Sequence, residues 1–190
     1  MRIFLNKRSL IVISIVLILI YGASYFFLKR SSINTPEEID FTKVSSTYKD
    51  FKLGVSTENE LREKLGTPLD ETLSGDKKIL EYSSNNPNFN NEITISSDKV
   101  YFVKEIISPE DNVSITSLKN KYGQYKNTLY GQSSEVGFDL FPYPEKGVAF
   151  VGNEKTGDVI EVWYFSPNTY ENFKNLYAKD FTEDFRQTSH

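Results

Sequence analysis

One short pattern occurs twice along the chain and constrains the fold more than any other feature. The segment Leu61–Gly66 (LREKLG) is matched 57 positions later by Leu118–Gly123 (LKNKYG). The Thr-Leu-x-Gly of Thr72–Gly75 returns in Thr128–Gly131, in the same order. The end of each unit also matches, because a Ser-Pro dipeptide closes it at Ser108 and again at Ser166. We infer a structural unit that is used twice.

Each unit begins with the signals of a short helix. Thr57 and Glu60 have the spacing of a capping box, in which each side chain bonds the backbone amide of the other residue. Gly66 supplies a helix stop, so the pattern predicts a helix over Glu58–Leu65. A two-turn helix is marginal alone and needs a surface to pack on. We expect that surface to be a sheet.

Short β-rich runs between turn signals supply the strands. In the first unit they lie near residues 71–73, 78–83, 92–96 and 100–107, and in the second near 126–130, 135–141, 148–151 and 158–165. Within 92–96, alternation places Ile93 and Ile95 on one face and Thr94 and Ser96 on the other. Two further segments have helical spacing: Phe41, Val44, Tyr48 and Phe51 favour a helix or extended turn, and Tyr170, Phe173, Tyr177 and Phe181 favour a closing helix capped by Asn168.

An uninterrupted apolar run, Leu10–Leu28, precedes both units. Nineteen residues in a helix reach about 28 Å, close to the hydrocarbon thickness of a bilayer. Small residues at Gly22–Ser24 offer a cleavage site, yet the apolar run continues beyond them, which favours an uncleaved signal anchor. Basic residues before the run place the N-terminus in the cytoplasm and the rest of the chain outside the cell membrane.

The predicted fold class is therefore α+β: an N-terminal transmembrane helix, two helix–antiparallel-sheet repeats and a C-terminal helix. The expected divisions are a cytoplasmic tail (1–8), a transmembrane signal anchor (9–28), a linker (29–40), a first repeat (41–110), a second repeat (111–167), and a helix with a tail (168–190).

Composition argues against most chemistry. The chain has no cysteine, and its one histidine is the final residue, His190. A disulfide framework, a thiolate metal site and a cysteine nucleophile are thereby excluded, and we expect no metal, no cofactor and no enzymatic activity. The net charge is −4, and residues 1–30 carry five basic side chains and no acidic one, so the remainder is distinctly acidic. An acidic domain repels phosphate backbones, which argues against a nucleic-acid partner.

The run Phe51–Pro68 resembles a motif of two exported families, the β-lactamase inhibitor proteins and the SmpA/OmlA outer-membrane assembly lipoproteins. The shared residues are Gly54, Thr57, Leu61 and the Leu65-Gly66-x-Pro68 stop. The resemblance implies helices packed on an antiparallel sheet whose open face binds another protein. The chain departs from it at Asn112, where the second copy lacks the glycine, and in having no cysteine.

Aromatic residues in or beside strands are the candidate binding anchors. We predict a protein-binding set of Tyr101, Tyr143, Trp163 and Tyr164, because Tyr and Trp on an open sheet face are typical contact residues. The preferred function is a membrane-anchored, extracytoplasmic protein-binding module, such as an assembly factor, inhibitor or sensor of the bacterial envelope. The alternatives are a small-ligand receptor or enzyme that uses polar loops at Ser83–Asn91 and Gly131–Glu135, and a purely structural spacer.

Overall fold

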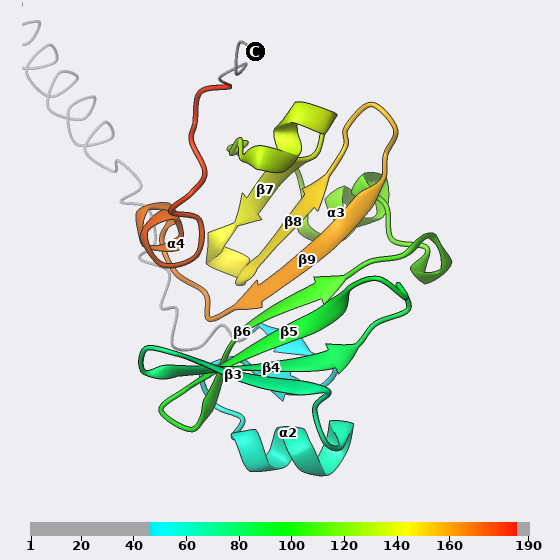
Figure 1. The fold of residues 1–190 in the computed structure, drawn as a ribbon. Helices are drawn as coiled ribbons and strands as arrows, with labels where there is room; N and C mark the ends of the chain where they lie inside the picture. Colours follow the sequence, from blue (N-terminus) through cyan, green and yellow to red (C-terminus); the bar gives the residue numbers. More distant parts are fainter. Residues whose placement is uncertain (1–45, 186–190) are drawn as a thin grey trace, which may run out of the picture. The chain divides into compact units, whose positions relative to one another are not determined.

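The structure, a computed structural model, describes residues 46–185. These residues form one antiparallel sheet of seven strands in the order β3-β4-β5-β6-β9-β8-β7, and a separate β1–β2 hairpin (Figure 1). The strands are β1 Thr47–Tyr48, β2 Phe51–Lys52, β3 Asp70–Ser74, β4 Lys77–Ser83, β5 Asn90–Ser96, β6 Lys99–Ile106, β7 Asp139–Tyr143, β8 Val148–Gly152 and β9 Val159–Phe165. The α-helices are α2 Glu58–Leu65, α3 Ile115–Tyr122 and α4 Tyr170–Tyr177, and the 3-10 helices are η1 Pro109–Asp111, η2 Gln132–Val136 and η3 Pro144–Lys146.

The predicted fold class is wrong. The described part of the chain is mostly β, with three short α-helices, instead of an α+β arrangement of two helix–sheet repeats behind a transmembrane helix. The strands of both halves join one sheet because β6 pairs with β9, which sets Val103 opposite Tyr164. Within residues 46–185 no helix has the length and apolar character needed to cross a membrane. The predicted span Leu10–Leu28, with its flanking tail and linker, lies outside the described residues.

Local signals at the two helix starts produce closely related geometry. Helix α2 has the predicted bounds, and the Thr57 hydroxyl accepts from the Glu60 amide while the Glu60 carboxylate accepts from the Thr57 amide. Helix α3 begins with the same reciprocal arrangement, made by Ser114 and Ser117. Each helix ends at a glycine in the left-handed φ range, Gly66 or Gly123.

The partner of each terminal glycine is a tyrosine on the sheet. The Tyr82 hydroxyl donates to the Gly66 carbonyl at 3.3 Å, and the Tyr143 hydroxyl donates to the Gly123 carbonyl at 2.6 Å. Asn112, which replaces the motif glycine, has a φ of 53°. Asparagine tolerates this left-handed conformation better than most residues, so the substitution preserves the turn.

Several other predictions need correction. Of the two elements that the spacing of Phe41, Val44, Tyr48 and Phe51 left open, the helix does not form at Tyr48 and Phe51, which lie buried in the β1–β2 hairpin. Phe41 and Val44 lie outside the described residues. Residues 126–130 contribute only single bridges and no named strand, and residues 132–136 form η2 ahead of β7. Helix α4 is capped by Thr169 instead of Asn168, and it ends before Phe181.

The two faces of the sheet are covered unequally. One face carries two buried clusters, and Tyr164 packs against both of them. The first lies under α2 and the β1–β2 hairpin and includes Leu80, Ile93 and Val103, and the second lies under α3.

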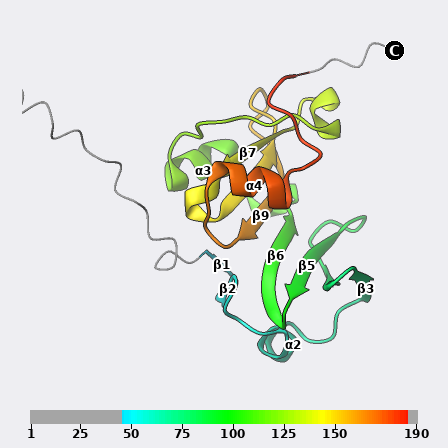
Figure 2. The same ribbon diagram turned by 90° about the vertical axis from the view of Figure 1, so that its left-hand side faces the viewer.

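On the other face, α4 and the segment that follows it cover β7, β8 and β9, where Phe173 packs on Phe165 (Figure 2). Tyr177 of α4 also stacks on Phe102 of β6. Strands β3 to β5 therefore have one face without a covering helix in the described part of the chain, and α4 covers β6 only in part.

Candidate functional site

The largely uncovered face of β3 to β6, which we term the bare face, consists of side chains in register. Its outer row runs Asp70, Glu81, Glu92 and Lys104 across the four strands, and its inner row runs Thr72, Ile79, Thr94 and Phe102. On β4, β5 and β6 the next residue points to the buried core, as alternation requires, whereas every residue of the edge strand β3 is exposed. All eight side chains are half-buried or exposed, whereas Leu80, Ile93 and Val103 on the reverse face are 0% exposed.

A groove of about 190 Å³ runs between the bare face and α4. Ile79, Thr94 and Phe102 lie on the sheet side, and Tyr177 and Leu176 line it from α4. Phe102 stacks on Tyr177 with ring centroids 5.3 Å apart, and it meets Trp163 edge-on at 5.6 Å. Leu176 remains 51% exposed. The groove thus presents apolar surface to solvent on a wall that ring packing holds in place.

A β-bulge brings a further aromatic ring to this groove. The register between β5 and β6 shifts, because Thr94 lies opposite Phe102 while Ile95 lies opposite Val100, so Tyr101 is the extra residue. A bulge redirects a side chain that regular alternation would send elsewhere. The Tyr101 ring lies 5.5 Å from that of Tyr177, and the Lys77 ammonium lies 4.2 Å above it.

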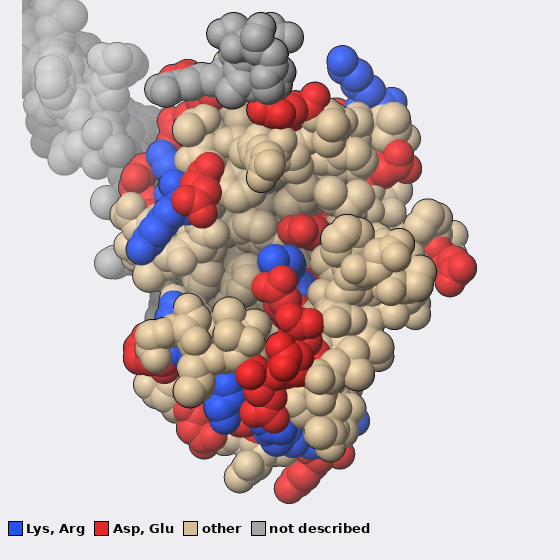
Figure 3. Space-filling view, in the orientation of Figure 1, with Lys and Arg blue, Asp and Glu red and all other residues tan. Residues whose placement is uncertain are grey.

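The outer row gives the bare face an acidic border. Glu81 lies directly opposite Asp70 on one side and Glu92 on the other. Lys104 neutralises Glu92 at 2.9 Å, and the Asn90 amide donates to Glu81 at 2.9 Å. Figure 3 shows the acidic atoms gathered over this half of the sheet. Like charges directly opposite each other destabilise a sheet by a few tenths of a kcal/mol to about 1 kcal/mol.

The four predicted anchor residues lie in different places. Trp163 is 6% exposed under the C-terminal segment, where its Nε1–H donates to Glu161. Tyr143 is buried on the reverse face, and Tyr164 is half-buried there and donates to Glu105. Only Tyr101 reaches the groove.

The residues that sequence reasoning missed are Ile79, Phe102 and the row of acids on the bare face, and Leu176 on the α4 side of the groove. Alternation within β5 correctly placed Thr94 and Ser96 on one face. It could not show that α4 would stop short of them. The missing information was the pairing of β6 with β9, which joins residues far apart in the sequence.

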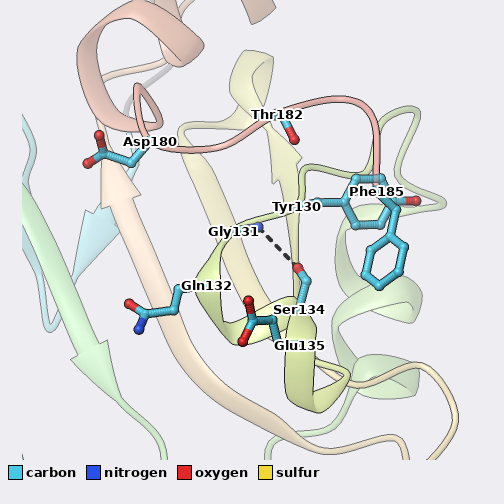
Figure 4. Close-up of a pocket in the computed structure, with 8 residues that line it drawn as sticks. All are labelled: Tyr130, Gly131, Gln132, Ser134, Glu135, Asp180, Thr182 and Phe185. Carbon is cyan, nitrogen blue, oxygen red and sulfur yellow. Dashed lines mark hydrogen bonds between the residues drawn. The ribbon is translucent and has the colours of Figure 1, made fainter. Parts of the chain in front are cut away.

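The two predicted polar loops line separate cavities. Gly131, Gln132, Ser134 and Glu135 line one of about 230 Å³ beneath the C-terminal segment, with Asp180 and Phe185 (Figure 4). There the Gly131 amide donates to the Ser134 hydroxyl at 3.1 Å, so part of its polar lining is already used. Residues 83–85 line a second cavity, which is more polar. Within residues 46–185 no cluster of His or acidic side chains has a geometry that could hold a metal ion.

Comparison with known proteins gives only distant structural matches. No protein-family model matches the chain, and no curated protein does. A solved structure of a DUF4309 family protein from Bacillus subtilis aligns with 66% of this chain and 90% of its own, at 12% identity and a TM-score of 0.46. A cysteine-rich secretory protein from Staphylococcus aureus aligns with 79% of this chain at 10% identity and a TM-score of 0.43, and the match spans 54% of that protein. Neither similarity is close enough to assign a function.

Proposed function

We propose that this chain is a non-catalytic protein-binding module, which docks a basic, partly apolar polypeptide segment on the bare face of β3 to β6. The module would be displayed outside the cell membrane by the apolar segment Leu10–Leu28, with the N-terminus in the cytoplasm. Its partner would be an envelope protein, as an assembly factor, inhibitor or sensor would have.

The observation that carries the proposal is the unequal covering of the sheet. An antiparallel sheet can leave one face in water, but such a face is normally polar along its length. Here the inner row contains Ile79 and Phe102, and the adjoining wall offers Leu176 and Tyr177. Aromatic and aliphatic side chains in a groove with a charged border are the usual composition of a binding surface.

Charge complementarity selects the partner. Asp70, Glu81 and Glu92 lie on neighbouring strands, and of the three only Glu92 faces a lysine across its row. A Lys or Arg side chain placed over Glu81 would relieve the repulsion that this row now carries. An acidic partner would meet the same row unfavourably. The groove beside it would take the apolar side chains of the same segment.

The resemblance of Phe51–Pro68 to the inhibitor and lipoprotein families supports the same surface. In those families the open face of the sheet binds another protein. The residues of that motif are structural here, since Thr57 caps α2 and Gly66 ends it. The partner would therefore bind to the strands of the bare face and not to the motif residues.

Site-specific photo-crosslinking in native membranes tests the proposal. A benzophenone side chain at Thr94, the centre of the bare face, is expected to give one discrete adduct. Peptide mapping should place the crosslink in a segment rich in Lys or Arg. Adding salt should lower the yield, since exposed charges are screened over about 8 Å at physiological ionic strength.

Two matched controls decide the outcome. The same probe at Val55, which is 59% exposed and precedes α2, should not give this adduct. Glu81→Lys should abolish the adduct, whereas Glu63→Lys on exposed α2 surface makes the same change in net charge and should preserve it. Equal adducts from Thr94 and Val55, or an adduct that Glu81→Lys leaves intact, would overturn the proposal.

A further inference from the structure

A second candidate site lies on the reverse side of the sheet from the bare face. It is a polar cavity of about 340 Å³ at the end of β6, and Lys49, Asn85, Asn91, Glu105 and Asp111 are among its lining residues. Glu105 follows Val103 by two positions, so its side chain shares the covered face of the sheet. The β1–β2 turn, the β4–β5 loop and η1 form the surrounding walls.

Hydrogen bonds hold these walls in fixed positions. Asn91 is 3% exposed, its amide donates to the Ser83 carbonyl at 2.9 Å, and its oxygen accepts from the Ile106 amide at 2.8 Å. The Asp111 carboxylate accepts from the backbone and hydroxyl of Ser108 and also from the Asn85 amide. Asn91 and Asp111 therefore hold the cavity walls together. Most of their hydrogen-bonding capacity is already used.

Two charged groups at this cavity are less completely satisfied. The Glu105 carboxylate accepts from the Tyr164 hydroxyl at 3.0 Å. Burial raises the pKa of Glu105, and the hydrogen bond to Tyr164 and the charge of Lys49 only partly offset that rise. The Lys49 ammonium lies 5.1 Å over the Tyr48 ring, and no carboxylate of residues 46–185 lies within 4.0 Å of it.

The turn that carries Lys49 is unusual. Lys49 and Asp50 both have positive φ, 46° and 72°, in the two-residue connection between β1 and β2. Glycine or asparagine normally occupies such positions, because other residues are strained there. Asp50 is held by Lys64 of α2 at 2.6 Å. The turn thus keeps a lysine at the cavity, opposite a carboxylate with which it forms no close ion pair.

We propose that this cavity binds a small zwitterion, a free α-amino acid or short peptide, with its ammonium group on Glu105 and its carboxylate on Lys49. Charge-assisted hydrogen bonds of both kinds are stronger than neutral ones. The cavity volume lies within the range of small-molecule sites, and its walls are pre-formed. The hydrogen bond from Tyr164 already orients the Glu105 carboxylate, so this side chain loses little conformational freedom when the ammonium group binds.

Calorimetric titration of the full chain with three matched probes tests this assignment. Alanine carries both charges, ethylamine only the ammonium group and propionate only the carboxylate. Alanine should bind at least tenfold more tightly than either of the others. Alanyl-alanine, whose charges lie farther apart, distinguishes a free amino acid from a peptide by its relative affinity. Alanine binding no more tightly than ethylamine or propionate would overturn the proposal without any substitution.

Substitutions of Glu105 and Lys49 test whether alanine binds in this cavity. Glu105→Gln and Lys49→Gln should each weaken alanine binding at least tenfold, while Lys52→Gln, on the exposed side of the same hairpin, should leave it unchanged. Binding that survives both cavity substitutions would place alanine elsewhere and refute the site. If one variant fails to fold, the other variant and the three-probe comparison still decide. The docking proposal concerns the opposite face, so either can fail alone.

Discussion

At the scale of single residues, Gly147 has the most demanding environment. Its φ is 66°, and a Cβ added there would meet the Phe165 carbonyl oxygen at 2.3 Å and the Ser46 side chain at 2.8 Å. Gly157 has a similar φ, 84°, but open space around it. Gly157→Ala should cost about 1–2 kcal/mol of unfolding free energy from the left-handed backbone alone. Gly147→Ala should cost distinctly more. Urea unfolding compares the two, and equal losses would show that the close approach does not matter.

Glu105 makes a pH-dependent contribution to stability. Burial raises its pKa in the folded protein above its ordinary value of 4.5, so the folded state binds this proton more tightly than the unfolded state does. The contribution of Glu105 to the free energy of unfolding is fully present below pH 4.5, and it is lost as the pH rises through the pKa of Glu105 in the folded protein. The groups around it are Tyr164, Tyr48, Lys49 and Asp111.

Glu105→Gln removes this proton while keeping an acceptor for Tyr164. Between pH 4 and pH 8 the wild type should therefore lose stability relative to the variant. Chemical denaturation of both proteins across this range measures the difference. A constant difference would mean that Glu105 titrates normally in the folded state.

Residue-scale sequence reasoning succeeded where a signal is local. The Thr57 and Glu60 spacing, with the Gly66 stop, predicted the bounds of α2, and alternation placed Ile93 and Ile95 on one face, which is the buried one. The expectation that Trp163 lies on an open face of the sheet was wrong, because its ring lies under Phe181. Burial of a strand residue depends on what covers it, and that cover comes from a distant part of the chain.

At the scale of elements, α4 attaches to the sheet through Phe173 and through the Tyr177 ring, which stacks on Phe102 and Phe165. Phe173 is 0% exposed and is the one fully buried residue of this helix, whereas Leu176 is half exposed on its groove side. Phe173→Ala should cost about 3–5 kcal/mol, as is usual for a buried phenylalanine. Leu176→Ala should change stability by less than about 0.5 kcal/mol and yet weaken the photo-crosslink at Thr94. Thermal unfolding with the crosslinking assay separates the two effects.

The hairpin β1–β2 shows why the sequence could not decide between a helix and a turn in one place. Tyr48 and Phe51 are three positions apart, which suits a helix face, but they are also directly opposite in a two-residue hairpin. The usual turn signal was absent, because Lys49 and Asp50 occupy positions that favour Asn-Gly. A strained turn is therefore hidden from sequence reasoning.

At the scale of the described domain, strand pairing was the decisive missing information. Most strands near their observed positions could be predicted, and so could the closing helix. The joining of β6 to β9 could not, because Val103 and Tyr164 are separated by most of the second unit. That one pairing makes a single sheet, leaves α4 on only half of it, and so creates the bare face.

A partner that covers the bare face in the cell should shield its groove from solvent. Hydroxyl-radical footprinting of the full chain, purified and in native membranes, measures this shielding. Oxidation of Tyr101 and Leu176 at the groove should fall several-fold in membranes, while oxidation of Val55, exposed near α2, should be the same in both samples. Equal oxidation of Tyr101 and Leu176 in the two samples would show that no partner covers the groove.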